Sequence, residues 1–454
     1  MPPQPTTNRD KGMKKSIATL ICALLAGGSA AAQEHPGGWT LRECIEFAQQ
    51  HNTAVQTQAV QVEQSGNELA TARLSRLPDL NASVGYNASF GRGTGDDNTF
   101  KTQTLQTGSF DVSASVPLFQ GFRINRTVKG NKLNLAAAVE ELERAREDVA
   151  VQVMTLYLQV LYNRELVGIA ERQLALSTQQ AERSRALVAA GKQPESARYE
   201  SEALAANDAL TLTSARNDLQ LALLDLSQAM NRESAAGFDI AEPSLDALLD
   251  NALSARPDAE TIYAYAAEHR PRIRAERLRM ESSENAIGIA RSSLYPSISL
   301  RGGYGTGLYS SMPVSFWPQF RKNSSEFVGV SLAIPIFNRN SVRSNIRDAQ
   351  FAARRQQLAL LDAEQSLRKE IEQAGYNVEA AGAKYRSAQA ALASAETAFG
   401  YEEERAKAGR STTFDFNDAK TRMERAAAEL VQAKFELVFR RKLLDYYRGE
   451  PLTL

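Results

Sequence analysis

The sequence predicts an α+β membrane protein made of two tandem repeats, each pairing a β-hairpin with a long α-helical hairpin. Three observations support this fold class. Motifs of the first half recur in the second at one constant offset, short runs alternate between apolar and polar residues, and long proline-free segments follow those runs. Only 43% of the 454 residues are hydrophobic and 7% aromatic, with a mean hydropathy of −0.36. Such a composition is typical of extended helices and coiled coils.

The first 32 residues are expected to be a signal peptide with an upstream extension. The pattern consists of a basic pair at 14–15, an apolar core over 16–25 and three alanines at 30–32 that form an A-x-A cleavage site. The apolar core is too short to cross a bilayer as a helix. We therefore expect the mature chain to begin at Gln33 and to be exported.

The two halves of the mature chain are related by an offset of 218 residues. Pro78 stands opposite Pro296, Gly191 stands opposite Gly409, and VPLF at 116–119 stands opposite IPIF at 334–337. Chance matches would scatter over many offsets, so this pattern indicates duplication. The expected organisation is a first repeat over 33–230, a connector over 231–257 and a second repeat over 258–454.

Each repeat contains two alternating runs that we predict to be membrane-spanning strands. They cover about 80–90 and 109–118 in the first repeat, and about 298–308 and 327–337 in the second. In the last run, apolar residues alternate with small residues: Val328, Val330, Leu332, Ile334 and Ile336 with Gly329, Ser331, Ala333 and Pro335. A spanning strand needs about 9–11 residues, with an apolar face toward lipid and a polar face toward the lumen. A soluble hairpin with one buried face gives the same periodicity, and periodicity alone does not exclude it.

Helices are predicted on both sides of each strand pair. A helix over about 41–76, ended by Pro78, opens the first repeat. A helical hairpin over 122–230 follows the first strand pair and turns at Gly191, and a second over 343–447 turns at Gly409. A helix over 122–190 would be about 100 Å long at about 1.5 Å per residue.

Four spanning strands per chain predict an oligomer. An open sheet edge in lipid leaves backbone hydrogen bonds unmade, and single-chain barrels begin at about eight strands. The chain is therefore expected to close a barrel with copies of itself, and a trimer would supply twelve strands. The long helices would then continue the barrel as a tube.

With these motifs the chain resembles the TolC family of outer membrane efflux proteins. The resemblance rests on LPDLNASVGY, VPLFQGFR, SLYPSISLRGGYG and IPIFNRN at the strands, and on AGKQPESA and AGRSTTFDFNDAKT at the turns. It covers almost the whole mature chain. It implies a homotrimer in which a twelve-stranded β-barrel in the outer membrane is continued by an α-helical barrel in the periplasm. It also implies a passive exit duct for substrates that an inner-membrane transporter and a periplasmic adaptor (membrane fusion protein) deliver.

The resemblance assigns a periplasmic gate to Asp415 and Asp418, because FDFNDA matches the paired acidic positions of the family. The two aspartates lie one helical turn apart, so both can face the same way. The first repeat offers Glu200 opposite Asp418. A structural alternative is that Asp415 completes a capping box with Thr412 while Asp418 complements the helix N-terminus.

Two further groups of residues are candidates for contacts outside the chain. The turns lie farthest from the membrane, so their residues are candidates for docking the adaptor: Gly191, Lys192, Gln193, Gly409, Arg410, Ser411 and Thr412. Helix capping uses the same residues. Phe119 and Phe337 follow strands and are candidates for a membrane-interface aromatic belt, with ordinary packing as the alternative.

The sequence contains no motif that indicates an enzyme, a cofactor site or a metal site. His35, His51 and His269 are scattered, and the last two stand at equivalent repeat positions, which favours a structural role. Cleavage of the signal peptide leaves Cys44 as a single cysteine, and Lys plus Arg balances Asp plus Glu at 53 each, which does not favour nucleic acid as a partner. A periplasmic adaptor and a structural coiled-coil protein remain as alternatives. The adaptor would carry one helical hairpin and a lipoyl-like domain, and the coiled coil would lack the alternating runs.

Overall fold

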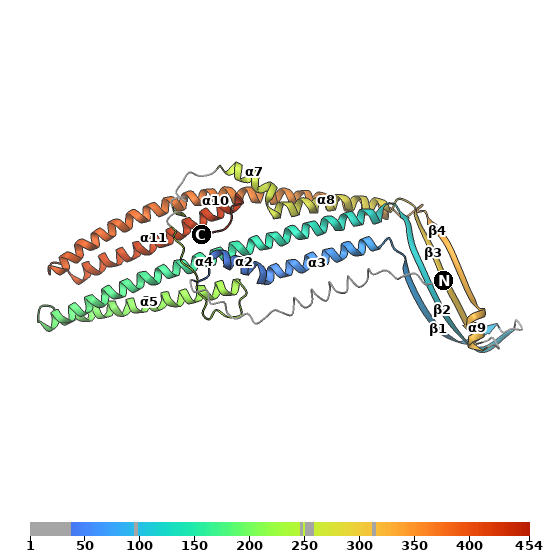
Figure 1. Ribbon diagram of the computed structural model, residues 1–454, viewed down its shortest axis with the longest axis horizontal. Coiled ribbons are helices and arrows are strands. Elements are labelled where there is room, and N and C mark those ends of the chain that lie inside the picture. The colour runs from blue at the N-terminus through green and yellow to red at the C-terminus, as the bar shows by residue number, and fades with distance from the viewer. Residues whose placement is uncertain (1–37, 95–98, 246–247, 250–257, 311–314) are drawn as a thin grey trace, which may run out of the picture.

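The computed structural model describes residues 38–94, 99–245, 248–249, 258–310 and 315–454. The expected signal peptide, its cleavage site and part of the expected connector lie outside the described residues. Figure 1 shows an elongated molecule with four strands at one end and the turns of two helical hairpins at the other.

Each helix of the first half has a counterpart in the second half, with both bounds shifted by 218 residues. The pairs are α2 (Leu41–His51) with α7 (Ala259–His269), α3 (Thr53–Leu74) with α8 (Pro271–Ser292), α4 (Arg123–Ala189) with α10 (Ser341–Lys407), and α5 (Glu195–Ala229) with α11 (Thr413–Tyr447). The short helix α9 (Phe316–Lys322) lies between the last two strands. The offset seen in the motifs therefore extends to the helix ends.

The opening helix of each half is broken, so the prediction of one helix over about 41–76 was wrong. The breaks fall at the equivalent residues Asn52 and Arg270, which have extended backbone angles. The Asn52 side chain accepts a hydrogen bond from the backbone N–H of Ala54 and so caps α3. In the second half Pro271 begins α8, and a proline disfavours the helical conformation of the residue before it.

His51 and His269 end the first helix of each half in the same way. Each Nδ1 lies 2.9 Å from the carbonyl oxygen four residues earlier, that of Phe47 or Tyr265. Each imidazole also stacks on the ring of that residue. These contacts fit the structural role expected from their equivalent positions.

The long helices α4 and α10 form the spine of the two halves. With 67 residues each, they extend about 100 Å at about 1.5 Å per residue. Along its length α4 packs first against α3 and then against α5, while α10 packs first against α8 and then against α11. Contacts of α4 with α8 and α11 join the halves.

The strands form one antiparallel sheet in the order β1-β2-β3-β4. Their bounds are β1 (Asp79–Thr94), β2 (Phe100–Gln120), β3 (Ser297–Tyr309) and β4 (Ser324–Ala333). β1 and β2 extend beyond the expected runs over 80–90 and 109–118, because they stay paired as far as Thr94 and Phe100. β4 ends at Ala333, before Pro335, which has no backbone N–H for a ladder.

One surface of the sheet, called the apolar face, carries the apolar half of each alternating run. The register aligns Val84 with Phe110 and Phe110 with Thr306, and it aligns Val116 with Leu300 and Leu300 with Val330. Large side chains on this face are exposed in the single chain: Leu80, Val84, Tyr86, Phe90, Val328, Val330 and Leu332. Gly303, Asp111 and Ser331 belong to the opposite face.

The main hydrophobic core lies at the waist of the molecule, where α3 gives way to α5 beside α4. It joins Cys44 of α2, Met154 of α4, Leu226 of α5 and Leu437 of α11, all fully or almost fully buried. The Tyr157 hydroxyl donates toward the carbonyl oxygens of Trp39 (3.1 Å) and Ala241 (2.7 Å), which fixes the connector against this core.

None of the helices in the described ranges combines the length with the apolar character that crossing a membrane requires.

Candidate functional site

The two helical hairpins end in turns of the same conformation. Gly191 and Gly409 have φ of +69° and +71°, in the left-handed region that favours glycine. Backbone N–H groups at the turns bond back to carbonyls of the preceding helix, from Lys192 to Leu187 (2.9 Å) and from Arg410 to Arg405 (2.8 Å). This is the Schellman arrangement that ends a helix and reverses the chain.

The side chains next to the turns fall into two groups. Gln193 accepts a hydrogen bond from the Ser184 hydroxyl (3.2 Å), and the Ser411 hydroxyl donates to Glu402, so both are tied to the preceding helix. Lys192 and Arg410 are exposed at the turns. Of the candidate docking residues, these two present cationic side chains at the end of the molecule.

The expected gate carboxylates are both engaged within α11. The Thr412 hydroxyl donates to Asp415 Oδ2 at 2.8 Å, and the backbone N–H of Asp415 donates to Thr412 Oγ1 at 3.1 Å. Asp418 forms an ion pair with Arg422 at 2.8 Å, one helical turn further on. The capping contact weighed from the sequence is therefore present, and both carboxylates remain at least partly exposed.

Glu200 is exposed on α5, the second arm of the other hairpin. Within the described part of the chain, no hydrogen bond or ion pair links it to Asp415 or Asp418. Figure 1 shows the two hairpins side by side, with separate turns. A single chain therefore does not assemble the three carboxylates into one cluster.

A buried ion-pair group that sequence reasoning missed joins the second arms of the hairpins. Lys420 of α11 is 1% exposed, and its Nζ lies 2.5 Å from Asp208 Oδ2 on α5. Glu424 Oε1 lies 3.1 Å from the same Nζ, at an ion-pair distance without hydrogen-bond geometry. We call Lys420, Asp208 and Glu424 the buried triad.

Burial dominates the electrostatics of the triad. It raises the pKa of the Glu424 carboxyl, while the charge of Lys420 acts in the opposite direction. A buried ammonium that faces two carboxylates is stable only while it keeps partners. The triad therefore holds α5 and α11 together through charge in a largely buried place.

Further polar contacts join the hairpins, among them the hydrogen bond from the Tyr446 hydroxyl of α11 to Glu147 of α4 at 2.9 Å. Lys434 Nζ of α11 lies 2.5 Å from Glu165 of α4. Arg183 of α4 donates from Nη2 to the carbonyls of Ala406 (3.3 Å) and Lys407 (3.2 Å) at the C-terminal end of α10, where the helix dipole favours a cation.

The repeat register does not reveal the triad in the sequence. Lys420 stands opposite Glu202 in the repeat register, Asp208 opposite Ala426, and Glu424 opposite Ala206. The two halves differ at most aligned positions of α5 and α11, so a departure from the repeat does not single out these three residues.

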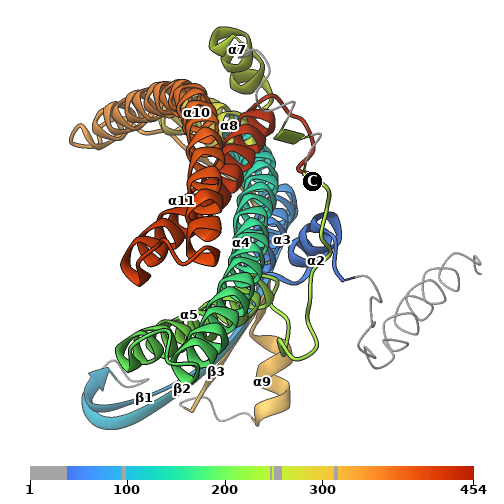
Figure 2. The same cartoon turned by 90° about the vertical axis from the view of Figure 1, so that its left-hand side faces the viewer.

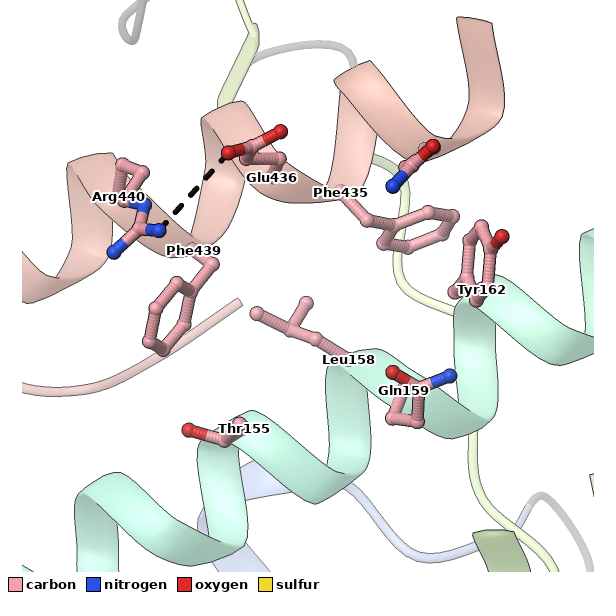
Figure 3. A pocket seen from close by; sticks show the side chains of 9 residues that line it. Thr155, Leu158, Gln159, Tyr162, Phe435, Glu436, Phe439 and Arg440 are labelled. Atoms are coloured by element: carbon pink, nitrogen blue, oxygen red, sulfur yellow. Dashed lines mark ion pairs between the residues drawn. The ribbon is translucent and has the colours of Figure 1, made fainter. Parts of the chain in front are cut away.

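A shallow groove of about 340 Å³ lies between α4 and α11 near the waist. Figure 3 shows Leu158, Tyr162, Phe435 and Phe439 in it, with Phe435 beside Tyr162. Polar side chains complete the lining: Thr155, Gln159, Gln432, Glu436 and Arg440. Both walls belong to one chain, so we interpret the groove as incomplete packing between the hairpins.

The candidate interface aromatics lie where the sheet meets the helices. Phe119 is paired with Ile298 at the end of β2, and its ring contacts that of Phe122 at a centroid distance of 5.4 Å. Phe337 lies just beyond β4 and is exposed. In the described ranges no group of three or more His, Cys, Asp or Glu residues is placed to hold a metal ion.

Comparison with known proteins identifies what the chain is similar to. The family model described as "Outer membrane efflux protein" matches residues 44–232 and 262–442. The outer membrane efflux protein BepC of Brucella suis is 23% identical over 93% of this chain and 87% of its own length. The cobalt-zinc-cadmium resistance protein CzcC of Cupriavidus metallidurans is 25% identical over 70% of this chain and 69% of its own length. The structure of the outer membrane protein VceC of Vibrio cholerae superposes with a TM-score of 0.74, at 17% identity, over 90% of this chain and 96% of that one.

Proposed function

Because the chain belongs to the outer membrane efflux protein family, we propose that three copies form a barrel through the outer membrane that helices continue as a tube. The chain is an outer membrane channel subunit of an efflux or secretion system, and its helical part lies in the periplasm. The equal offset of the bounds of the four helix pairs supports the interpretation that one repeat was duplicated.

The observation that carries the trimer is the open sheet with an exposed apolar face. β1 and β4 are the edges of the four-stranded sheet, and each has one neighbouring strand. Lipid offers no hydrogen bonds to an unpaired edge, so a sheet that crosses the membrane must close. Pairing β1 of one copy with β4 of the next closes a ring, and three copies give twelve strands.

The same architecture bears on the two alternatives that the sequence left open. Two helical hairpins share one sheet, whereas a periplasmic adaptor is expected to have one hairpin. A structural coiled-coil protein would lack the sheet. We propose instead that an adaptor is a partner, which docks at the turns beside the exposed Lys192 and Arg410 and links the channel to an inner-membrane transporter.

The trimer is tested by native mass spectrometry of protein extracted from outer membranes in mild detergent. The expected mass is that of three mature chains, each beginning at Gln33. A stable monomer in detergent-free buffer, or a different number of copies, would overturn the proposal. An uncleaved N-terminus would contradict the predicted export signal.

The exposed aspartates of α11 support a charged gate at the periplasmic entrance. In a trimer, Asp415 and Asp418 would supply six carboxylates at one level of the tube, with Glu200 nearby on the other hairpin. A ring of carboxylates favours cations and responds to pH. Because both aspartates also bond within α11, the test must remove charge and keep the helix cap.

The variant Asp415→Asn, Asp418→Asn meets that requirement, since an amide oxygen still accepts the hydrogen bond from Thr412. In planar bilayers we expect weaker cation preference and larger conductance. Thr412→Ala is the matched control, because it removes the cap at a cost of about 1 kcal/mol and retains both carboxylates. A selectivity change in Thr412→Ala equal to that of the double variant would leave only the capping role.

A further inference from the structure

The helix α9 lies against the strands, at the end of the sheet far from the long helices (Figure 1). The Thr306 hydroxyl donates to the carbonyl oxygen of Phe320 at 2.9 Å, and the Phe320 ring lies 6.0 Å from that of Phe110. Thr306 and Phe110 are register partners on the apolar face, and Thr306 is only 4% exposed. α9 therefore covers this face of β3.

Hydrogen bonds fix α9 to the end of β3. The Gln319 side chain accepts from the backbone N–H of Tyr309 (2.9 Å) and donates to its carbonyl (3.2 Å). Asn323 Nδ2 donates to the carbonyl of Gly307 at 2.6 Å. In Figure 2, α9 lies beside the strands on the side of the molecule where α2 and α7 are found.

The outer surface of α9 is aromatic and basic. Trp317 is 68% exposed and Phe316 is 52% exposed, and their rings contact each other at a centroid distance of 5.1 Å. Arg321 and Lys322 follow in the last turn and are exposed. Neither forms an ion pair with any residue in the parts of the chain that the structure describes.

The level of α9 on the sheet matches a membrane border. Ile298 of β3 lies opposite Phe119, and Leu308 of β3 lies next to the residues that bond α9. Between Ile298 and Leu308 the strand covers about 33 Å at about 3.3 Å per residue. A tilt of about 40° reduces this to a height of about 25 Å, which is the usual height of a lipid-facing apolar band. Phe119 would lie at one border of the band and α9 at the other.

We propose that α9 binds the headgroup region of the outer membrane from outside the barrel, with Trp317 and Phe316 among the lipids and Arg321 and Lys322 at lipid phosphates. This rests on the proposed function, in which the apolar face meets lipid. Because α9 is continuous with the apolar face, we identify lipid as the partner that contacts α9. Tryptophan with one apolar and one polar edge prefers this region, and basic side chains attract anionic headgroups there.

The competing position for α9 is over the pore. A helix in that position would cover the face that carries Gly303 and Asp111, whereas α9 is bonded to Thr306 and packed on Phe110 of the other face. The connection between β3 and β4 is thus an anchor on the outside of the barrel and leaves the pore mouth to other segments.

The test uses the two tryptophans of the chain, Trp39 and Trp317. The full-length trimer is reconstituted in phosphatidylcholine and phosphatidylglycerol vesicles whose lipids carry bromine at different depths. Bromine near the headgroup is expected to quench wild-type fluorescence, and this quenching is lost in Trp317→Phe, which retains Trp39 at the waist. Trp39→Phe is the matched control and should keep it. Quenching of Trp317 by aqueous iodide with none by brominated lipid would overturn the proposal.

A second probe separates this inference from the proposed function. Val330→Cys carries a fluorophore on the apolar face, and native Cys44 is fully buried and escapes the label. Quenching of the Val330 probe without quenching of Trp317 refutes the anchor and leaves the membrane-spanning sheet standing. If lipid bromine quenches neither, both proposals fail. Arg321→Gln, Lys322→Gln should make the Trp317 depth independent of phosphatidylglycerol. An unchanged dependence would remove the basic pair from the lipid contact.

Discussion

Replacing Lys420 with methionine is expected to destabilise the helical part of the subunit strongly. The substitution keeps the apolar stem of the side chain and removes the charge that faces Asp208 (2.5 Å) and Glu424 (3.1 Å). Two carboxylates then remain close together in a site where their side chains are 11% and 16% exposed. Their hydration cannot replace the lost ammonium.

The magnitude follows from this burial. Removing one partner of a buried ion pair costs about 3–5 kcal/mol, because the remaining charge is left unpaired. We expect about 3 kcal/mol for Lys420→Met, the lower end, since both carboxylates keep some contact with water. The matched control is Arg425→Met on the same helix. Arg425 pairs with Glu429 at 3.0 Å with side chains 81% and 54% exposed, and such pairs contribute at most about 0.5 kcal/mol.

The effect should depend on pH in a defined direction. The pKa of Glu424 is raised in the folded protein by burial, and Lys420 opposes that rise. A carboxyl whose folded pKa exceeds its unfolded value lowers stability at high pH, and this penalty disappears as the pH falls through the folded pKa. Lys420→Met removes the opposing charge and so raises the pKa of Glu424 further. The stability deficit of Lys420→Met relative to the wild type should therefore shrink on acidification.

The assay is urea unfolding of the purified protein in detergent, followed by circular dichroism at neutral and mildly acidic pH. A deficit in Lys420→Met no larger than in Arg425→Met would refute the buried-charge argument. A deficit of the same size at both pH values would refute the electrostatic explanation and leave a packing effect.

Three more predictions concern the sheet, the turns and the core. Leu332→Arg should cost about 2–4 kcal/mol and impair trimer assembly in lipid, while Ser331→Arg should assemble and change conductance; the reverse result would invert the face assignment. Gly409→Ala should cost about 1 kcal/mol in thermal unfolding through its φ of +71° alone, because a Cβ there meets nothing within 4 Å, and Gly409→Asn should cost less. The Cys44 thiol, whose pKa burial raises to about 12, should resist alkylation at pH 8 until the protein is unfolded, and fast labelling of the native protein would contradict its burial.

Local sequence signals placed the long helices because they need no partner to be recognised. The turns at Gly191 and Gly409 and the absence of proline from the arms gave hairpins close to those observed. The breaks at Asn52 and Arg270 were missed although Pro271 marks one of them, because helical periodicity continues on both sides. The strand ends were less accurate. β1 and β2 continue beyond the apolar runs because their backbones stay paired, whereas β4 stops before Pro335, which the alternating pattern had included.

The candidate gate shows how far the resemblance reaches. It selected Asp415 and Asp418 at the turn, and the alternative capping contact with Thr412 is also present. Whether the carboxylates meet in a ring depends on chains that lie outside a single protomer. Charge at the entrance is therefore a proposal that conductance must test.

The sequence by itself determined the long helices, the alternating strands and the family. Helices and strands are recognised from local periodicity and the family from short motifs, and neither requires knowledge of a tertiary contact. Tertiary structure alone decided that Lys420 meets Asp208 and that α9 folds onto Phe110 and the apolar face. Each contact joins residues from different arms or strands, where the balance between burial and charge depends on distances that no local pattern encodes.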